Sequence, residues 1–217
     1  MKSKSKFSDV WGMVIIAVLF LTLFISCSVP TPSMAPTISV GDRFITVRRI
    51  FCDINAQDII IFKYPDDESV FYCKRVIGTP GDVVESKDGI IYVNGTQLEE
   101  SYVEENAGDN WIFYIPKKGD KVDVIDNIAY IDGYYVGESK AFLDFYCEDG
   151  FVKDDCYFCM GDNRTNSLDS RYWNNHFVMQ GKIKSEVKLC YFSKDIEHIG
   201  LFNKENKVFG KQDCKIR

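Results

Sequence analysis

The sequence has little histidine and no excess of basic charge. It contains two histidines, and its formal net charge is −6 over 217 residues. So few histidines argue against histidine-rich metal chemistry, and an acidic chain lacks the basic surface that nucleic acids require. We therefore expect no nucleic-acid partner, no metal and no other cofactor. The length suffices for one domain with a buried core, or for one domain with a small satellite.

Charge is absent between Asp9 and Asp42, and within this gap residues 10–29 are almost entirely apolar. A helix of about 20 such residues crosses a hydrocarbon core of roughly 30 Å. Lysines at positions 2, 4 and 6 precede the run, and no basic residue follows it before Arg43. This asymmetry favours an N-terminus in the cytoplasm.

The run therefore predicts three regions. We expect residues 1–9 in the cytoplasm, residues 10–29 as a single transmembrane helix in the cytoplasmic membrane, and residues 30–217 as an extracytoplasmic domain. A secretory signal peptide is the first alternative, although its apolar region usually has only about 7–15 residues. Lipid attachment at Cys27, after a poor lipoprotein-like box that begins at Phe24, is the second. A buried core helix is the third.

The chain has only one C-x-x-C pair among its eight cysteines, at Cys156 and Cys159. A zinc site would need a second pair of ligands, so a strand that points the two thiols to opposite faces explains the spacing better. Cys27 belongs to the predicted anchor, which leaves seven cysteines in the domain. An odd number means that at least one thiol is unpaired or bonds to another chain.

Turn signals and short β-branched or aromatic runs alternate after the anchor, without a repeat or a low-complexity tract. The runs predict strands over residues 43–49, 58–63, 70–77 and 89–93. Asn94-Gly95 between two such runs indicates a tight hairpin. We expect a mainly β fold. Residues 83–155 are the least regular part, and we interpret them as a variable insertion that is less involved in chemistry than its flanks.

The first motif with chemical character is Pro30-Thr-Pro-Ser-Met-Ala-Pro-Thr37, and it is followed by Gly41-Asp-Arg. Proline biases the residue before it to an extended conformation, so Thr31 and Ala35 should be extended and Ser33 should lie on a stiff, non-helical stretch. Alternation of side chains along extended backbone places the Thr31 hydroxyl on the side of Ser33. A serine nucleophile beside a second hydroxyl donor suits acyl transfer, although a linker turn is the commoner explanation of such a segment.

The second motif is Tyr72-Cys-Lys-Arg-Val-Ile-Gly-Thr-Pro-Gly-Asp82. Strand alternation sends Lys74 and Arg75 to opposite faces, so one of them should point inward. Burial lowers the pKa of a lysine, and a neutral lysine can activate a serine without histidine. Two solvent-facing charges on an edge strand are the alternative.

The third motif, Met160-Gly-Asp-Asn-Arg-Thr-Asn-Ser-Leu-Asp-Ser-Arg-Tyr172, is rich in hydroxyls, amides and charges and follows a predicted strand. A polar hairpin loop is the simple interpretation. The alternative is a supporting network, in which Ser167 orients the neutral lysine amine while Asp169 and Arg171 pair and hold the turn.

Together and in this order, the three motifs resemble those of bacterial type I signal peptidases, the leader peptidases, a family of serine proteases with a Ser–Lys dyad. The matching stretches are Ser33-Met-x-Pro-Thr37, Gly41-Asp-Arg43, Lys74-Arg-Val-Ile-Gly-x-Pro-Gly-Asp82 and Gly161-Asp-Asn-Arg-x-Asn-Ser-x-Asp-Ser-Arg171. Thr31 stands where many members carry serine or glycine. Thr165 replaces a frequent aspartate.

The resemblance implies that Ser33 is the nucleophile and Lys74 the general base. Ser167 would orient the lysine, the Ser33 amide and the Thr31 hydroxyl would form the oxyanion hole, and Asp169 and Arg171 would be structural partners. The implied fold is a β-rich catalytic core with a variable insertion. The implied substrates are exported preproteins with small residues at the first and third positions before the cut, and the implied surroundings are the lipid bilayer and the secretion translocase.

Three alternatives to this interpretation remain at the level of sequence. A Ser-His-Asp mechanism would use His176 or His198, but neither lies in a recognisable motif. Related Ser–Lys proteases that cut themselves in cytosolic repressors would not need the anchor. An anchored β-domain that only binds, tethered through Cys27, would lose nothing but a charge on substitution of Lys74.

Overall fold

The computed structural model describes residues 10–14 and 23–202, and β-strands dominate it. The main sheet has eight strands, ordered β1-β2-β16-β3-β4-β14-β15, with β17 beside β16. Its strands are β1 (Phe24–Ser28), β2 (Arg43–Arg48), β3 (Ile59–Tyr64), β4 (Asp67–Gly78), β14 (Cys156–Met160), β15 (Val178–Met179), β16 (Ile183–Phe192) and β17 (Gly200–Leu201). All pairings in this sheet are antiparallel. The predicted mainly β class is therefore correct.

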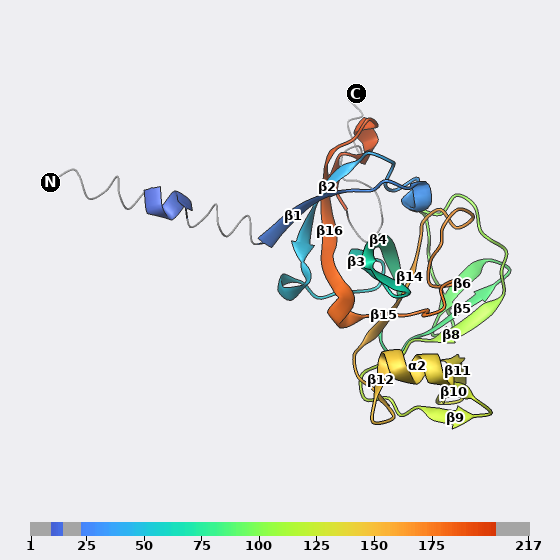
Figure 1. Ribbon diagram of the computed structural model, residues 1–217. Coiled ribbons are helices and arrows are strands. Elements are labelled where there is room, and N and C mark those ends of the chain that lie inside the picture. Colours follow the sequence, from blue (N-terminus) through green and yellow to red (C-terminus); the bar gives the residue numbers. More distant parts are fainter. Residues whose placement is uncertain (1–9, 15–22, 203–217) are drawn as a thin grey trace.

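The span predicted as an insertion, residues 83–155, forms smaller sheets beside the main one (Figure 1). They contain β5 (Val83–Lys87), β6 (Ile90–Val93), β7 (Thr96–Gln97), β8 (Trp111–Tyr114), β9 (Asp123–Ile125), β10 (Ile128–Ile131), β11 (Tyr134–Glu138), β12 (Cys147–Glu148) and β13 (Phe151–Val152). One α-helix, α2 (Ser139–Tyr146), packs near β11 and β12. The 3-10 turns of the described chain are η1 (Pro32–Met34), η2 (Arg49–Phe51), η3 (Gln180–Lys182) and η4 (Ile196–His198).

The small sheets and the main sheet share a hydrophobic core. One buried cluster joins Val84 and Phe113 of the small sheet to Phe158 of the main sheet. The Phe113 and Phe158 ring centroids lie 5.0 Å apart, and Trp111 packs 5.4 Å from Phe158. The two regions are therefore one packed body at this contact.

Two local predictions are confirmed. Asn94 and Gly95 both have positive φ, 51° and 77°, and join β6 to β7 as the sequence indicated. Cys156 and Cys159 lie on one strand, β14, and enter two different buried clusters. Their spacing therefore reflects strand alternation. All seven cysteines in the described chain are free thiols, and Cys214 lies outside it.

The predicted helix over residues 10–29 is wrong at its C-terminal end. Residues 24–28 form β1, which pairs in register with β2 from Phe24 opposite Val47 to Ser28 opposite Arg43. Hydropathy alone does not separate a helix from a buried strand, and here the ladder to β2 satisfies the backbone. Residues 10–14 are helical, and 15–22 lie outside the described residues. Among the described residues, no helix is long and apolar enough to span a membrane.

Candidate active site

Ser33 lies in η1, directly after β1. Thr31 and Ala35, the residues before the two prolines, have ψ values of 152° and 145°, so both are extended as predicted. The predicted non-helical stretch around Ser33 is wrong, however, because Pro32–Met34 forms one 3-10 turn, closed by the bond from the Ala35 amide to the Pro32 carbonyl, 3.0 Å. Ser33 is almost fully buried in this turn.

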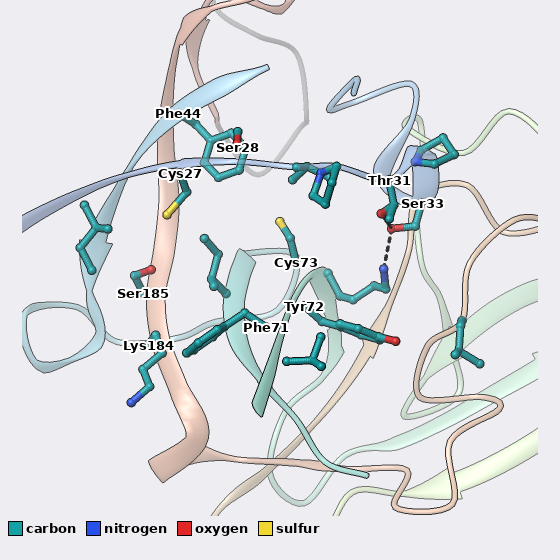
Figure 2. Close-up of a pocket in the computed structure, with 18 of the residues that line it drawn as sticks. Cys27, Ser28, Thr31, Ser33, Phe44, Phe71, Tyr72, Cys73, Lys184 and Ser185 are labelled. Atoms are coloured by element: carbon teal, nitrogen blue, oxygen red, sulfur yellow. Dashed lines mark hydrogen bonds between the residues drawn. The ribbon is translucent and has the colours of Figure 1, made fainter. Parts of the chain in front are cut away.

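Lys74 reaches Ser33 from the middle of β4. Its Nζ donates a hydrogen bond of 2.6 Å to Ser33 Oγ, marked in Figure 2. Only 4 % of Lys74 is exposed. Burial lowers the pKa of Lys74 below its usual 10.5, while nearby acidic groups, including Asp169 and Asp162, act in the opposite direction. The arrangement brings a serine hydroxyl into contact with an amine that loses its proton more readily than usual.

Lys74 points inward, as the sequence predicted for one of the two cations, and Arg75, next along the strand, is buried as well, so the alternative of two solvent-facing charges is excluded. Both faces of β4 are covered at this point. Arg75 Nε donates to Asp162 Oδ1 at 2.8 Å, and Arg75 also donates to the Gln57 carbonyl at 2.8 Å. Asp162 in turn accepts a hydrogen bond of 2.5 Å from the Thr37 hydroxyl.

This Thr37–Asp162–Arg75 cluster ties all three sequence motifs together. Arg75, Thr37 and Asp162 all belong to the motifs, but none of the three had a predicted role in the site. The signal that could have identified these three residues was their position inside the stretches that resemble the family's motifs.

The Thr31 hydroxyl lies beside the Ser33 hydroxyl, with Oγ1 3.3 Å from Ser33 Oγ. Figure 2 shows both side chains at the same end of the cleft. A threonine hydroxyl at this position can donate a hydrogen bond to a group that is bound next to Ser33 Oγ.

Ser167 lies close to the same point but makes no bond to the lysine. Its Oγ is buried and is without a hydrogen-bond partner within the described part of the chain. A Cβ added to Gly161 would clash with both the Ser167 hydroxyl and the Ser33 carbonyl, so these two groups flank one glycine. The glycine allows the third motif to approach the nucleophile closely.

Asp169 and Arg171 form the ion pair that the third motif suggested. Arg171 donates from Nε to Asp169 Oδ1 at 2.8 Å and from its terminal nitrogen to Oδ2 at 2.9 Å. Asp169 Oδ2 also accepts the Gly161 amide at 2.9 Å. Neither residue contacts the Ser33 hydroxyl, and their bonds fix the loop.

The two histidines have other neighbours. His176 Nδ1 lies 2.7 Å from the Ser170 carbonyl oxygen, and its ring packs on Phe113. His198 Nδ1 lies 3.0 Å from Asp42 Oδ2. Neither hydrogen-bonds to a serine hydroxyl in the described structure, so the Ser-His-Asp alternative has no geometric support. No group of three or more His, Cys, Asp or Glu side chains in the described residues could hold a metal ion.

A cleft of about 830 Å³ opens beside Ser33 and Lys74. Its walls are mostly apolar and come from β1, β2, β3, β4 and β16, with Ile25, Ile61 and Val70 among them. Figure 2 shows Cys27, Phe44, Cys73 and Ser185 around the same cleft. β1 is the end strand of the sheet and pairs only with β2 among the described strands. An edge strand beside a cleft can pair with an extended peptide.

Comparison with known proteins identifies the family. The model of the family "Signal peptidase, peptidase S26" matches residues 6–192. Signal peptidase I of Aquifex aeolicus is 33 % identical over 211 residues, which cover 83 % of this chain and 81 % of the relative. Signal peptidase I S of Bacillus subtilis is 34 % identical over 178 residues, 78 % of this chain and 81 % of the relative. A crystal structure of a signal peptidase I from Enterococcus faecalis aligns with a TM-score of 0.40 at 26 % identity, covering 62 % of this chain and 97 % of that one.

Proposed function

Because the chain belongs to the signal peptidase family, peptidase S26, and is a serine protease of that class, we propose that it cleaves N-terminal signal peptides from exported preproteins with Ser33 as nucleophile and Lys74 as general base. The observation that carries this proposal is the 2.6 Å contact between Lys74 Nζ and Ser33 Oγ inside the protein. The buried amine supports it, because a base must be neutral to accept a proton.

The proposed first step is acylation. Neutral Lys74 Nζ takes the proton of the Ser33 hydroxyl, and Oγ attacks the scissile carbonyl carbon. The carbonyl π electrons move to oxygen, and the resulting oxyanion accepts hydrogen bonds from the Thr31 hydroxyl and the Ser33 amide. As the C–N bond breaks, Lys74 gives its proton to the departing amine, which is the N-terminus of the mature protein.

The proposed second step releases the signal peptide. Lys74, neutral again, takes a proton from water, and the hydroxide attacks the acyl-enzyme carbonyl. Collapse of the second tetrahedral intermediate breaks the bond to Ser33 Oγ, which regains its proton from Lys74. Ser167 would orient the amine by donating to it once Lys74 is neutral, since the buried Ser167 hydroxyl has no other partner in the described chain.

The cleft supports the assignment of the substrate class. The cleft that ends at Ser33 has mostly apolar walls, which include Ile25 and Phe44, and such walls suit uncharged side chains on an extended chain. β1, the end strand of the sheet among the described strands, lines the same cleft and can add that chain as a neighbouring strand. Asp169 and Arg171 hold the loop that closes this end of the cleft.

We also propose that the protein is anchored to the cytoplasmic membrane by its apolar N-terminal run, with residues 1–9 inside and the domain from residue 30 outside. β1 begins at Phe24, so 14 apolar positions, 10–23, precede it. As a helix they would measure about 21 Å, less than the hydrocarbon core of roughly 30 Å. The bilayer would thin locally, and the domain would lie directly at its surface, where signal peptides emerge.

The test of the dyad is cleavage of a model preprotein by the full-length protein in detergent, with the product's N-terminus sequenced. Ser33→Ala and Lys74→Met should each lower the rate by a factor on the order of 10³ or more, because each removes a group that acts in the transition state. Lys182→Met, which removes a partly exposed lysine of η3, should leave the rate within about twofold. Cleavage by Ser33→Ala at the parental rate would exclude the proposal.

A further inference from the structure

The loop between β7 and β8, residues 98–110, contacts arginines of the second and third motifs. Arg164 forms a two-bond ion pair with Glu100. The Arg75 guanidinium lies 4.1 Å from the centre of the Tyr102 ring. This loop belongs to residues 83–155, which we interpreted from the sequence as less involved in the chemistry than their flanks, and its contacts connect it to both flanking motifs.

The contacts of Glu100 lie inside the protein. The Glu100 side chain is 9 % exposed and that of Arg164 is 2 % exposed. The Tyr102 hydroxyl donates to Glu100 Oε1 at 3.1 Å, and Tyr102 itself is buried. Loss of one partner of a buried ion pair leaves an uncompensated charge, so the neighbouring backbone must move or admit water.

A short path of hydrogen bonds leads from Glu100 to the nucleophile. Arg164 Nε donates to the Gly161 carbonyl at 3.1 Å, and two residues later the Asn163 amide donates to the Ser33 carbonyl at 3.2 Å. Gly161 is also the residue that separates the Ser33 carbonyl from the Ser167 hydroxyl. The Glu100–Arg164 pair therefore holds residues 161–163 in place. This segment hydrogen-bonds to the turn that contains Ser33, Pro32–Met34, which we call the nucleophile turn.

A second path runs through Tyr102. Its ring packs on the guanidinium of Arg75, and Arg75 binds Asp162, which accepts the Thr37 hydroxyl. Arg75 follows Lys74 on β4, so a shift of Arg75 also displaces the base. Glu100 and Tyr102, which are bonded to each other, thus support both members of the dyad from one loop.

We propose that Glu100 is a positioning residue for the hydrolysis, and that with Tyr102 it makes the 98–110 loop part of the active site's support. This inference rests on the proposed function of Ser33 and Lys74. Glu100 touches neither substrate nor dyad. Its bond to Arg164 keeps segment 161–163 against the nucleophile turn and keeps water away from the amine. A displacement of about 1 Å at such a site can cost on the order of 100-fold in rate.

The experiment uses the full-length protein and a model preprotein. Glu100→Ala should lower kcat about 10- to 100-fold with KM changed less than about threefold, because the substrate cleft is untouched while the dyad loses its alignment. Glu100→Gln keeps one acceptor for Arg164 and should lie between Glu100→Ala and the parent. Tyr102→Phe keeps the ring on Arg75 and should lose no more than about threefold. The matched control is Glu104→Ala, which removes an exposed carboxylate from the same loop.

A second readout separates positioning from simple stability. The acid limb of kcat/KM against pH reports the amine of Lys74, which faces Cys73, Asp169 and Asp162. If Glu100 keeps water from this amine, the limb of Glu100→Ala moves to higher pH than in the parent. A purely structural role would lower the melting temperature of Glu100→Ala but leave kcat of the folded fraction and the pH limb at parental values, and that result overturns the inference.

Comparing Arg164→Ala with the double variant Glu100→Ala/Arg164→Ala tests the inference even if Glu100→Ala alone folds poorly. In Arg164→Ala the Glu100 charge has lost its partner, so the double variant Glu100→Ala/Arg164→Ala should be no slower than Arg164→Ala alone. Additive losses would contradict the proposed path. The parent and Ser33→Ala are assayed alongside. An inactive parent or an active Ser33→Ala contradicts the proposed function. If the parent is active and Ser33→Ala is inactive, but Glu100→Gln and Glu100→Ala are both fully active, only the role of Glu100 is contradicted.

Discussion

Lys74 is held inside the protein with its amine on the Ser33 hydroxyl, and burial lowers its pKa below 10.5. Activity should therefore rise with pH as the amine loses its proton and then level off, since only the neutral form accepts the proton of Ser33. The rise in kcat/KM should fit one ionisation with a pKa below 10.5. A profile that stays flat from neutral to strongly basic pH would argue against a titrating amine.

The same shift predicts a change in stability with a definite sign. The unfolded Lys74 keeps its proton up to about pH 10.5, whereas the folded one loses it at lower pH. Between these two values the unfolded state binds more protons, so Lys74 makes the free energy of unfolding rise with pH. Buried cysteines and tyrosines with raised pKa values contribute with the opposite sign in the same range. The free energy of unfolding of the parent minus that of Lys74→Met, both measured with urea, should therefore become more positive as the pH rises. A difference that does not change with pH would contradict the lowered pKa of Lys74.

Single residues also show how far the sequence could anticipate the site. Proline spacing and an apolar flank made a chemical role for Ser33, Thr31 and Lys74 conceivable, and the resemblance to the family's motifs singled these residues out. Ser33 Oγ lies 3.3 Å from Thr31 Oγ1 and 2.6 Å from Lys74 Nζ. Glu100 escaped prediction because its partner, Arg164, lies 64 positions away, and nothing in the local pattern encodes that pairing.

Among the elements, strands bounded by turn signals were predictable to within about three residues at each end. The run at residues 58–63 became Ile59–Tyr64, and 70–77 became Asp67–Gly78. β1 was not predictable, because its apolar residues continue a longer apolar run and its strand character comes from pairing with β2. α2 spans only eight residues, and a run of that length does not separate the helical period from the strand period.

β14 connects the main sheet to the small sheet through Phe158, which is fully buried against Trp111 and Phe113. Phe158→Ala should cost about 3–5 kcal/mol of unfolding free energy, because it opens a cavity between two elements. Phe71→Ala, at a half-exposed ring on β4, is the matched control and should cost far less. Urea unfolding followed by tryptophan fluorescence measures both. Equal losses in the two variants would show that the aromatic contact does not join the sheets.

At the scale of the whole molecule, the position of β1 restricts how the N-terminus is processed. Cleavage before Cys27, as in a lipoprotein, would remove Phe24, Ile25 and Ser26 from a strand of five residues that leads directly into the nucleophile turn. The folded domain thus includes residues that a cleaved leader would take away. An uncleaved apolar N-terminus is consistent with this packing.

The protein should have a single anchored topology, which can be measured in sealed membrane vesicles. The parent should resist extraction at alkaline pH and keep Met1 or Lys2 as its N-terminus, while a protease added on the extracytoplasmic side should digest the domain and spare an N-terminal tag. Leu19→Arg should reduce membrane integration, because a central arginine raises the free energy of insertion by about 2.5–3.5 kcal/mol. Ile125→Arg, on the exposed strand β9, should integrate like the parent. A mature N-terminus at Cys27, or a domain protected on the extracytoplasmic side, would contradict the single anchored topology, since either would require β1 and the cleft to lie elsewhere relative to the bilayer.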